Sequence, residues 1–231
     1  MSRIYDLVRE GGPVMIPLVG LSIASIATAL ERTWFWFQLL SQEQQIVHDV
    51  LEAARHDLNK AVAISERAQS LAIGRFLLAP LKLKQPTPDT FRLALETAAD
   101  KEFVQMRKGD KFLETVVGIA PLLGLLGTVT GLIRTFNNLN IGGGGTSEGA
   151  TKAAAGIGEA LIATAAGMVV AIIALAIFRV MVTLQARQID YFSEVGNELE
   201  LIYRQVWYEP TFHNNSHPTK PEKPPLPIDG Y

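Results

Sequence analysis

One acidic residue, Glu159, lies inside a long apolar segment, and its carboxylate is the group in the chain best suited to charge-dependent chemistry. The segment runs from Gly156 to Phe178, and Glu159 is its one charged side chain. An acidic side chain at the centre of a membrane costs roughly 2.5–3.5 kcal/mol on insertion scales, so such a residue is a functional-site hypothesis by default. We therefore take Glu159 as the first candidate residue of a polar route through the bilayer.

Two threonines could extend this route: Thr128 in the preceding apolar segment, and Thr164 in the same segment as Glu159. Thr128 lies about 9 Å below Arg134 at helical rise, and Thr164 lies about 7.5 Å from Glu159. If the two segments run in opposite directions, the three polar groups lie on either side of a single depth in the membrane. A separation of about 140° around the helix nevertheless keeps Glu159 and Thr164 off one narrow face. Each threonine hydroxyl could also bond the carbonyl four residues back on its own helix.

The depth of Glu159 depends on which residue marks the opposite membrane surface. If Arg179 marks that surface, about 20 residues of helix place Glu159 at the outer edge of the bilayer. If the Arg179 side chain instead snorkels to the surface, Glu159 is buried. The sequence leaves both alternatives open.

Small residues recur along both apolar segments, where they would let membrane helices approach closely. The candidates for helix packing are Gly124, Gly127, Gly131 and Gly167. Alanines and further glycines between Ala153 and Ala166 add to this pattern. Such richness in small residues indicates helix packing far more often than it indicates a pathway.

Composition places the chain among integral membrane proteins. It has 231 residues, 48% of them hydrophobic. Three charge-free stretches, Gly11–Leu30, Thr115–Ile133 and Ala160–Phe178, are each long enough to cross a hydrocarbon core of about 30 Å. We predict an all-α fold with three transmembrane helices, long cytoplasmic helical extensions and a pentameric bundle, the last on the family resemblance described below.

The distribution of basic residues predicts the orientation. Eleven Lys or Arg lie between Trp34 and Phe112 and five follow Phe178, against two in the first 12 residues and one between Asn137 and Gly158. The positive-inside rule therefore predicts an external N-terminus and a cytoplasmic C-terminus. The predicted order is an external N-terminus (1–12), first transmembrane helix (13–33), cytoplasmic helical region (34–112), second transmembrane helix (113–136), external glycine-rich loop (137–152), third transmembrane helix (153–178), cytoplasmic helix extension (179–208) and disordered proline-rich tail (209–231).

Helical signals continue outside the three spans. Ser41 and Gln44 have the spacing of a capping box, and apolar residues then recur at helical spacing from Val47 to Ser65, which predicts one amphipathic helix. A short helix over Leu71–Ala79 should stop at Pro80. Thr87-Pro88-Asp89 predicts the start of another helix, which we expect to run unbroken into the second span. The third span should continue as helix to Trp207, with an apolar stripe that needs partner helices from this subunit or a neighbour.

Several classes of function are disfavoured. A net charge of −2 and the lack of a basic stripe argue against nucleic acid. Zero cysteines exclude thiolate chemistry, and His213 and His217 lie in the proline-rich tail, so we expect no metal and no cofactor. No nucleophile–base pair or phosphate-binding loop is present, so we do not expect an enzyme.

Two motifs resemble a known family. Ala120–Val129 (APLLGLLGTV) and Gly156–Ala165 (GIGEALIATA) look like the paired signatures of the MotA/TolQ/ExbB proton-channel family. The three-span layout is similar to its ExbB/TolQ branch, and the resemblance covers roughly residues 13–206. This chain differs mildly, with Gly-Ile-Gly before Glu159 where many members have alanine, and with an unusually proline-rich tail.

The resemblance implies a homopentamer in the bacterial inner membrane, surrounded by lipid, whose second and third helices line a pore around an ExbD-like single-span dimer. It implies that Thr128, Glu159 and Thr164 form the ion pathway and that proton motive force drives a TonB-like transducer for outer-membrane import. Two alternatives stay open. One is a TolQ-like role in envelope integrity and division, and the other is a non-conducting membrane scaffold.

Overall fold

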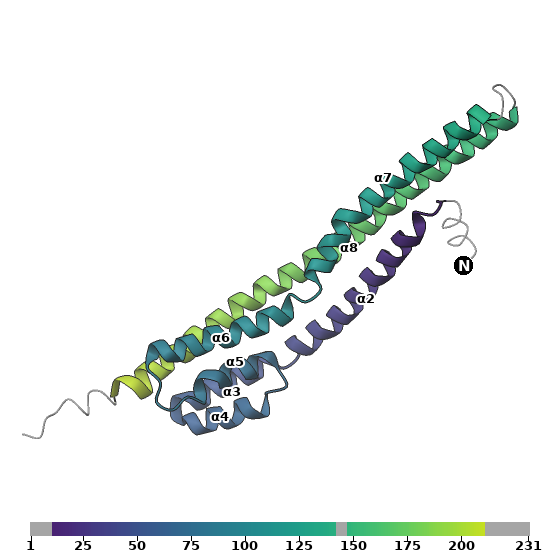
Figure 1. The fold of residues 1–231 in the computed structure, drawn as a ribbon. Helices are drawn as coiled ribbons and strands as arrows, with labels where there is room; N and C mark the ends of the chain where they lie inside the picture. Colours follow the sequence, from purple (N-terminus) through teal and green to yellow (C-terminus); the bar gives the residue numbers. More distant parts are fainter. Residues whose placement is uncertain (1–10, 142–146, 211–231) are drawn as a thin grey trace, which may run out of the picture. The chain divides into compact units, whose positions relative to one another are not determined.

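The computed structural model describes residues 11–141 and 147–210, and every regular element in these ranges is a helix. The elements are α2 (Met15–Leu40), α3 (Glu43–His56), α4 (Leu58–Arg67), α5 (Ala72–Leu81), α6 (Pro88–Met106), α7 (Asp110–Ile141), α8 (Ser147–Ile202) and the π-helix η1 (Tyr203–Tyr208) (Figure 1). The predicted all-helical fold is confirmed for this part of the chain. Residues 1–10 of the predicted external N-terminus, the four consecutive glycines of the loop and most of the tail lie outside the described residues.

The chain forms two compact units. Unit 1 combines Met1–Ser41 with Phe103–Asp190, and unit 2 combines Gln42–Glu102 with Tyr191–Tyr231. Helices α6 and α8 contribute to both. Each unit is therefore described separately.

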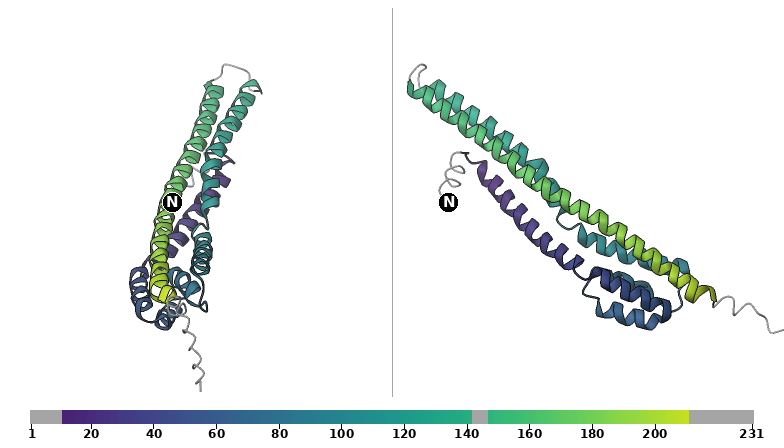
Figure 2. Two further views of the ribbon diagram at one scale, coloured as in Figure 1. Left: turned by 90° about the vertical axis from the view of Figure 1, so that its left-hand side faces the viewer. Right: turned by 180° about the vertical axis from the view of Figure 1, so that it is seen from behind.

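Unit 1 consists mainly of α2, α7 and most of α8, with α7 and α8 side by side in opposite directions (Figure 2). All three helices contribute to one core, in which Leu18, Leu113 and Ala174 are buried. The core is completed by Val14, Met15, Val116, Ala120, Ala171 and Met181. Short side chains at several of these positions bring the helices close together.

The outward faces of α2, α7 and α8 are also apolar. Exposed residues include Ile23, Leu122 and Ile172. By length and composition, three helices of the described residues could cross a membrane, which agrees with the number of spans predicted. The exposed apolar faces have the character expected of helices surrounded by lipid or by other membrane helices.

The structure corrects the expectation of an unbroken helix from Pro88 into the second span. Residues 107–109 form a turn between α6 and α7, and Gly109 has φ +93°. This left-handed conformation is readily adopted only by glycine. The helix is therefore interrupted just before the second long apolar helix.

A second break corrects the single helix predicted from Val47 to Ser65. Asp57 is extended, with φ −156° and ψ 108°, and separates α3 from α4. Its carboxylate accepts a hydrogen bond from the backbone N–H of Asn59 at 2.9 Å and so caps α4. An aspartate stabilises the start of the second helix better than it would stabilise a helix interior.

Helix ends in unit 2 were predicted with mixed success. The Thr87 cap is confirmed, because the N–H of Thr90 donates to Thr87 Oγ1 at 3.2 Å. The Ser41 capping box is wrong, since the Ser41 hydroxyl donates back to the Gln38 carbonyl and α3 has no side-chain cap. Pro80 lies within α5, which ends one residue later.

Aromatic side chains join the end of α8 to the other helices of unit 2. Phe192 contacts Phe76 with 4.8 Å between ring centroids, and Tyr203 stacks on Phe91 at 4.3 Å. The Trp207 Nε1–H donates to the Ala54 carbonyl at 2.8 Å. The apolar stripe of α8 thus has partners in the same subunit.

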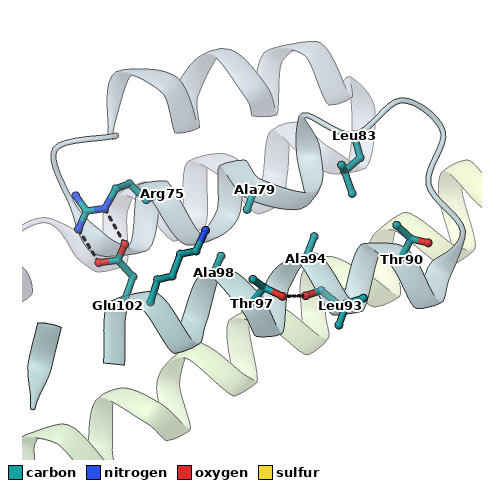
Figure 3. Close-up of a pocket in the computed structure, with 10 residues that line it drawn as sticks. Arg75, Ala79, Leu83, Thr90, Leu93, Ala94, Thr97, Ala98 and Glu102 are labelled. Carbon is teal, nitrogen blue, oxygen red and sulfur yellow. Dashed lines mark hydrogen bonds and ion pairs between the residues drawn. The ribbon is translucent and has the colours of Figure 1, made fainter. Parts of the chain in front are cut away.

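An apolar recess of about 490 Å³ lies between α5 and α6 in unit 2 (Figure 3). Its walls include Ala79, Leu93 and Ala98. At one end the Arg75 guanidinium donates two hydrogen bonds to the Glu102 carboxylate, at 2.6 and 2.7 Å. This hydrogen bonding raises the pKa of Arg75 above its usual value. The pair therefore ties α5 to α6 beside the recess.

We predict that Phe192→Ala destabilises unit 2. Phe192 is 1% exposed, and truncating a buried Phe to Ala typically costs about 3–5 kcal/mol. The midpoint of thermal unfolding of the detergent-solubilised protein should fall by several degrees. Leu201→Ala, at a position 53% exposed on the same helix, is the matched control and should change it little. Equal midpoints for the two variants would contradict this packing.

Candidate functional site

The site is organised by a line of small residues that we call the α7–α8 seam: Gly124, Gly127 and Gly131 of α7 facing Gly156, Ala160, Ala163 and Gly167 of α8. A Cβ added at Gly127 would lie 2.5 Å from the Ala163 Cβ, and one added at Gly167 would lie 2.6 Å from the Ala120 carbonyl oxygen. Real Cβ atoms do not approach other atoms this closely. Glycine at these positions therefore permits the backbone approach, as small residues do between membrane helices.

Thr164 bonds across this seam. Its hydroxyl donates to the Gly124 carbonyl of α7 at 2.9 Å. The contact is possible because a glycine leaves that carbonyl accessible, with a Cβ at Gly124 approaching the Thr164 Cα to 3.0 Å. Thr164 is thus the threonine of the predicted pathway that links the two helices, and it does not bond its own helix as the alternative interpretation allowed.

Thr128 bonds its own helix. Its hydroxyl donates to the Leu125 carbonyl at 2.7 Å, while the Thr130 hydroxyl two residues further on donates to the Leu126 carbonyl at 2.9 Å. The hydrogen bonds of the described residues do not join Thr128 to Glu159 or Thr164. A hydroxyl that donates to a carbonyl still has oxygen lone pairs with which to accept a hydrogen bond.

Glu159 faces Arg134 and Gly12, which lies just before α2 begins at Met15. Its Oε1 lies 3.7 Å from Arg134 Nη1, and the two side chains are 35% and 58% exposed, respectively. A Cβ at Gly12 would collide with the same Oε1, and Gly12 has φ +73°. Glu159 is therefore level with the start of α2. Because the pair is partly exposed and too long for a hydrogen bond, it contributes on the order of 0.2–1 kcal/mol.

Arg134 and Gly12 are site residues that the sequence reasoning missed. In the reasoning from sequence, Arg134 was used only as the reference point for the depth of Thr128 in the membrane. The available signal was its position as the first charge after the apolar stretch that ends at Ile133. Gly12 was counted only as part of an external segment. Nothing in the spacing of residues 12 and 159 could indicate that they meet.

A second polar cluster lies where α6, α7, α2 and α8 meet within unit 1. Arg32 is 3% exposed, and its Nη2 donates to the carbonyls of Gln105 and Met106 at 3.1 and 3.2 Å. The Gln185 amide donates to the Met106 carbonyl and to the Asp110 carboxylate. These donors satisfy carbonyls that the end of a helix leaves without partners. They stabilise the turn that starts α7 and so help to set its direction.

Metal binding has no candidate in the described ranges, where no group of three or more His, Cys, Asp or Glu is arranged to hold an ion. His213 and His217 lie outside the described residues. The polar groups at the site are a carboxylate, a guanidinium and hydroxyls. A carboxylate can accept and hold a proton and a hydroxyl can pass one on, whereas a guanidinium keeps its charge and only donates hydrogen bonds.

The structure has long apolar helices, a small-residue seam between two of them and a carboxylate at one end of that seam. These features define an integral membrane protein with a polar site between helices. The model of the MotA/TolQ/ExbB proton channel family matches residues 68–194. The chain belongs to this family, as its two motifs indicated.

The relatives include proteins named ExbB or ExbB-like and a protein named TolQ. A putative biopolymer transport protein ExbB-like 1 of Synechocystis is 68% identical over 208 residues, which cover 90% of this chain and 82% of that protein. The biopolymer transport protein ExbB of Salmonella typhimurium is 32% identical, with 78% and 76% covered. The Tol-Pal system protein TolQ of Haemophilus influenzae is 29% identical, with 84% and 89% covered.

The seam makes a testable prediction. Gly127→Leu should separate α7 from α8, because even a Cβ at this position meets Ala163, and overpacking typically costs about 1–3 kcal/mol. We expect a lower yield of folded protein and a lower apparent mass in size-exclusion chromatography. Gly20→Leu is the control, since a Cβ at Gly20 meets nothing within 4 Å. Normal yield and mass for Gly127→Leu would contradict the close approach.

Proposed function

We propose that the chain is a proton-channel subunit of the bacterial inner membrane that couples proton motive force to a TonB-like transducer for outer-membrane import. The observation that carries the proposal is the carboxylate of Glu159, which lies in the otherwise uncharged apolar part of α8 and faces Arg134. Coupled transport needs a polar route, because one charge crossing 100 mV is worth about 2.3 kcal/mol. A subunit that serves only helix packing does not need a polar route.

In this proposal Glu159 takes up a proton at the outer end of the α7–α8 seam, and the hydroxyls of Thr164 and Thr128 line the route below it. The Thr164 hydroxyl lies against the seam, where its donation to the Gly124 carbonyl fixes its direction. The oxygen of each threonine can then accept a hydrogen bond from a passing water or hydronium. The route needs no cofactor and no metal.

The proposal includes assembly of several copies around a pore. We propose a pentamer in which α7 and α8 surround the single-span helices of an ExbD-like dimer. The exposed apolar residues of α7 and α8, among them Leu125, Val129, Leu161 and Met168, supply surfaces for neighbouring copies, for the partner and for lipid. Relatives named ExbB support this assignment.

A TolQ-like role is the second candidate, favoured by the relative named TolQ. The two roles use the same site and differ in the transducer that the complex contacts. A neighbouring gene for a TonB-like protein supports import, whereas one for a TolA-like protein supports envelope integrity and division. A non-conducting scaffold is the third possibility, in which Glu159 serves only helix packing.

We predict that Glu159→Ala abolishes energised, partner-dependent uptake while the oligomer still forms. Thr164→Val and Thr128→Val should reduce uptake partially, because each removes one hydroxyl from the route. Glu114→Ala removes an exposed carboxylate outside the proposed route and is the matched control, with near-normal uptake expected. Uptake and oligomer yield are measured on the same membranes.

The hypothesis of a non-conducting scaffold predicts a different result for this variant. There, Glu159→Ala removes a group that is costly in lipid, so the change should be neutral or stabilising. Full uptake by Glu159→Ala, at normal oligomer yield, would therefore reject Glu159 as the proton-carrying residue.

The orientation has its own test. A reporter enzyme fused after Gly145 should read as external, and one fused after Glu198 as cytoplasmic, because basic residues concentrate in the segments proposed to be inside. Alkaline phosphatase and green fluorescent protein fusions at each position give complementary signals. A reversed signal at either position would overturn the proposed orientation.

A further inference from the structure

We propose that residues 224–229 of the proline-rich tail (PPLPID) dock in the recess between α5 and α6 of their own chain. The recess belongs to unit 2 and shares no residue with the proposed proton route, so this inference stands apart from the proposed function. Three features support it: an apolar recess open to its surroundings, a described chain that ends beside that recess, and a tail segment whose length and charge match it.

The recess presents apolar side chains without covering them. Leu93 of α6 is 61% exposed and Leu83, between α5 and α6, is 39% exposed, and both line the recess with Ala94 and Ala98 (Figure 3). Its volume of about 490 Å³ lies within the range of roughly 300–1,000 Å³ that is usual for binding pockets. An exposed apolar surface of this kind is typical of an interaction site.

The described part of the chain ends beside this recess. Trp207 of η1 and Phe91 of α6 line a second recess of about 180 Å³, and Leu83 lines both recesses, so the two adjoin. The last described residue, Pro210, follows Trp207 by three positions. Residues 211–223 then reach roughly 40 Å when extended, so the length of chain does not prevent residues 224–229 from entering the larger recess.

The most apolar stretch of the tail has the length of the recess. Residues 224–228 read PPLPI, and Asp229 follows. Prolines favour the polyproline II conformation, in which residues 224–229 would span about 15.5 Å at 3.1 Å per residue. Along α6 the lining of the recess extends from Thr90 to Lys101, which is about 16.5 Å at 1.5 Å per residue. Because proline has a fixed φ, such a segment loses little conformational freedom when it docks.

Charge sets the direction in which the segment lies. At one end of the recess Arg75 is bonded to Glu102, whereas Lys101 lines the same end and forms no ion pair within the part of the chain that the structure describes. If residue 224 is level with Thr90, then Asp229 is level with Lys101. An exposed ion pair adds little to affinity, so apolar contact would hold the segment and the Asp229–Lys101 pair would fix its direction.

A disulfide test on the purified full-length protein in detergent is possible because the chain contains no cysteine. In the recess pair, Ala98→Cys is combined with Ile228→Cys, two positions that the proposed alignment places level with each other. Mild oxidation should join them within one chain, which runs as a monomer on a non-reducing gel and yields the joined peptides in mass spectrometry. In the control pair, Val104→Cys replaces Ala98→Cys. Val104 is 67% exposed on the same helix but does not line the recess, so this disulfide should form about tenfold more slowly.

Two further changes test the contacts themselves. Leu226→Ser in the recess pair removes apolar contact and should slow its disulfide toward the rate of the control pair. Lys101→Glu and Asp229→Lys should each slow it about two- to fivefold, and the two together should restore the rate.

Each other outcome contradicts a stated part of the proposal. Equal rates for the recess pair and the control pair would overturn docking. A covalent dimer in place of the joined monomer would show that the tail of a neighbouring copy occupies the recess and would overturn docking within one chain. Rates that do not respond to either charge change would overturn the pairing of Asp229 with Lys101 and the proposed direction.

Discussion

The close approach of α7 and α8 is the constraint on which the polar site depends. At Gly124 and Gly167 the backbones lie so near that an added Cβ would reach a carbonyl or Cα of the opposite helix at 3.2 Å or less. In a bilayer no hydrophobic driving force brings two apolar helices together, so van der Waals contact between small residues and hydrogen bonds across the helices must do so. The Thr164 hydroxyl supplies one such bond.

This geometry explains how a carboxylate can be kept in an apolar helix. Glu159 lies at the end of the seam, level with the start of α2, where Arg134 offsets its charge and its side chain is still 35% exposed. In the proposed arrangement, with Glu159 at the outer edge of the bilayer, an ionised group costs less than it would at the bilayer centre. The proposed channel function requires a group at this position that exchanges protons with the outer side and leads into the seam.

The main features of the fold were predictable from the sequence because they follow from composition. Apolar length and helical spacing are local properties, and they predicted the three long helices and the continuation of α8. The break at Gly109 was not predictable, because the turn depends on Arg32 and Gln185, which are distant in sequence and donate to the carbonyls at the end of α6. At the candidate site, Glu159 was predictable from the sequence because it is an acidic residue inside an apolar segment. Its pairing with Arg134 depends on the register of α7 against α8, which residue spacing does not specify.

In the proposed function, protons cross the membrane by way of Glu159, and this step can be measured as proton flux. The purified complex, with the single-span partner that copurifies with it, would be reconstituted into liposomes containing a pH-sensitive dye and given a transmembrane pH gradient and potential. We expect flux through the parent complex and none above the empty-liposome rate through Glu159→Gln, which has almost the same shape but cannot ionise. Equal flux through both complexes would contradict it.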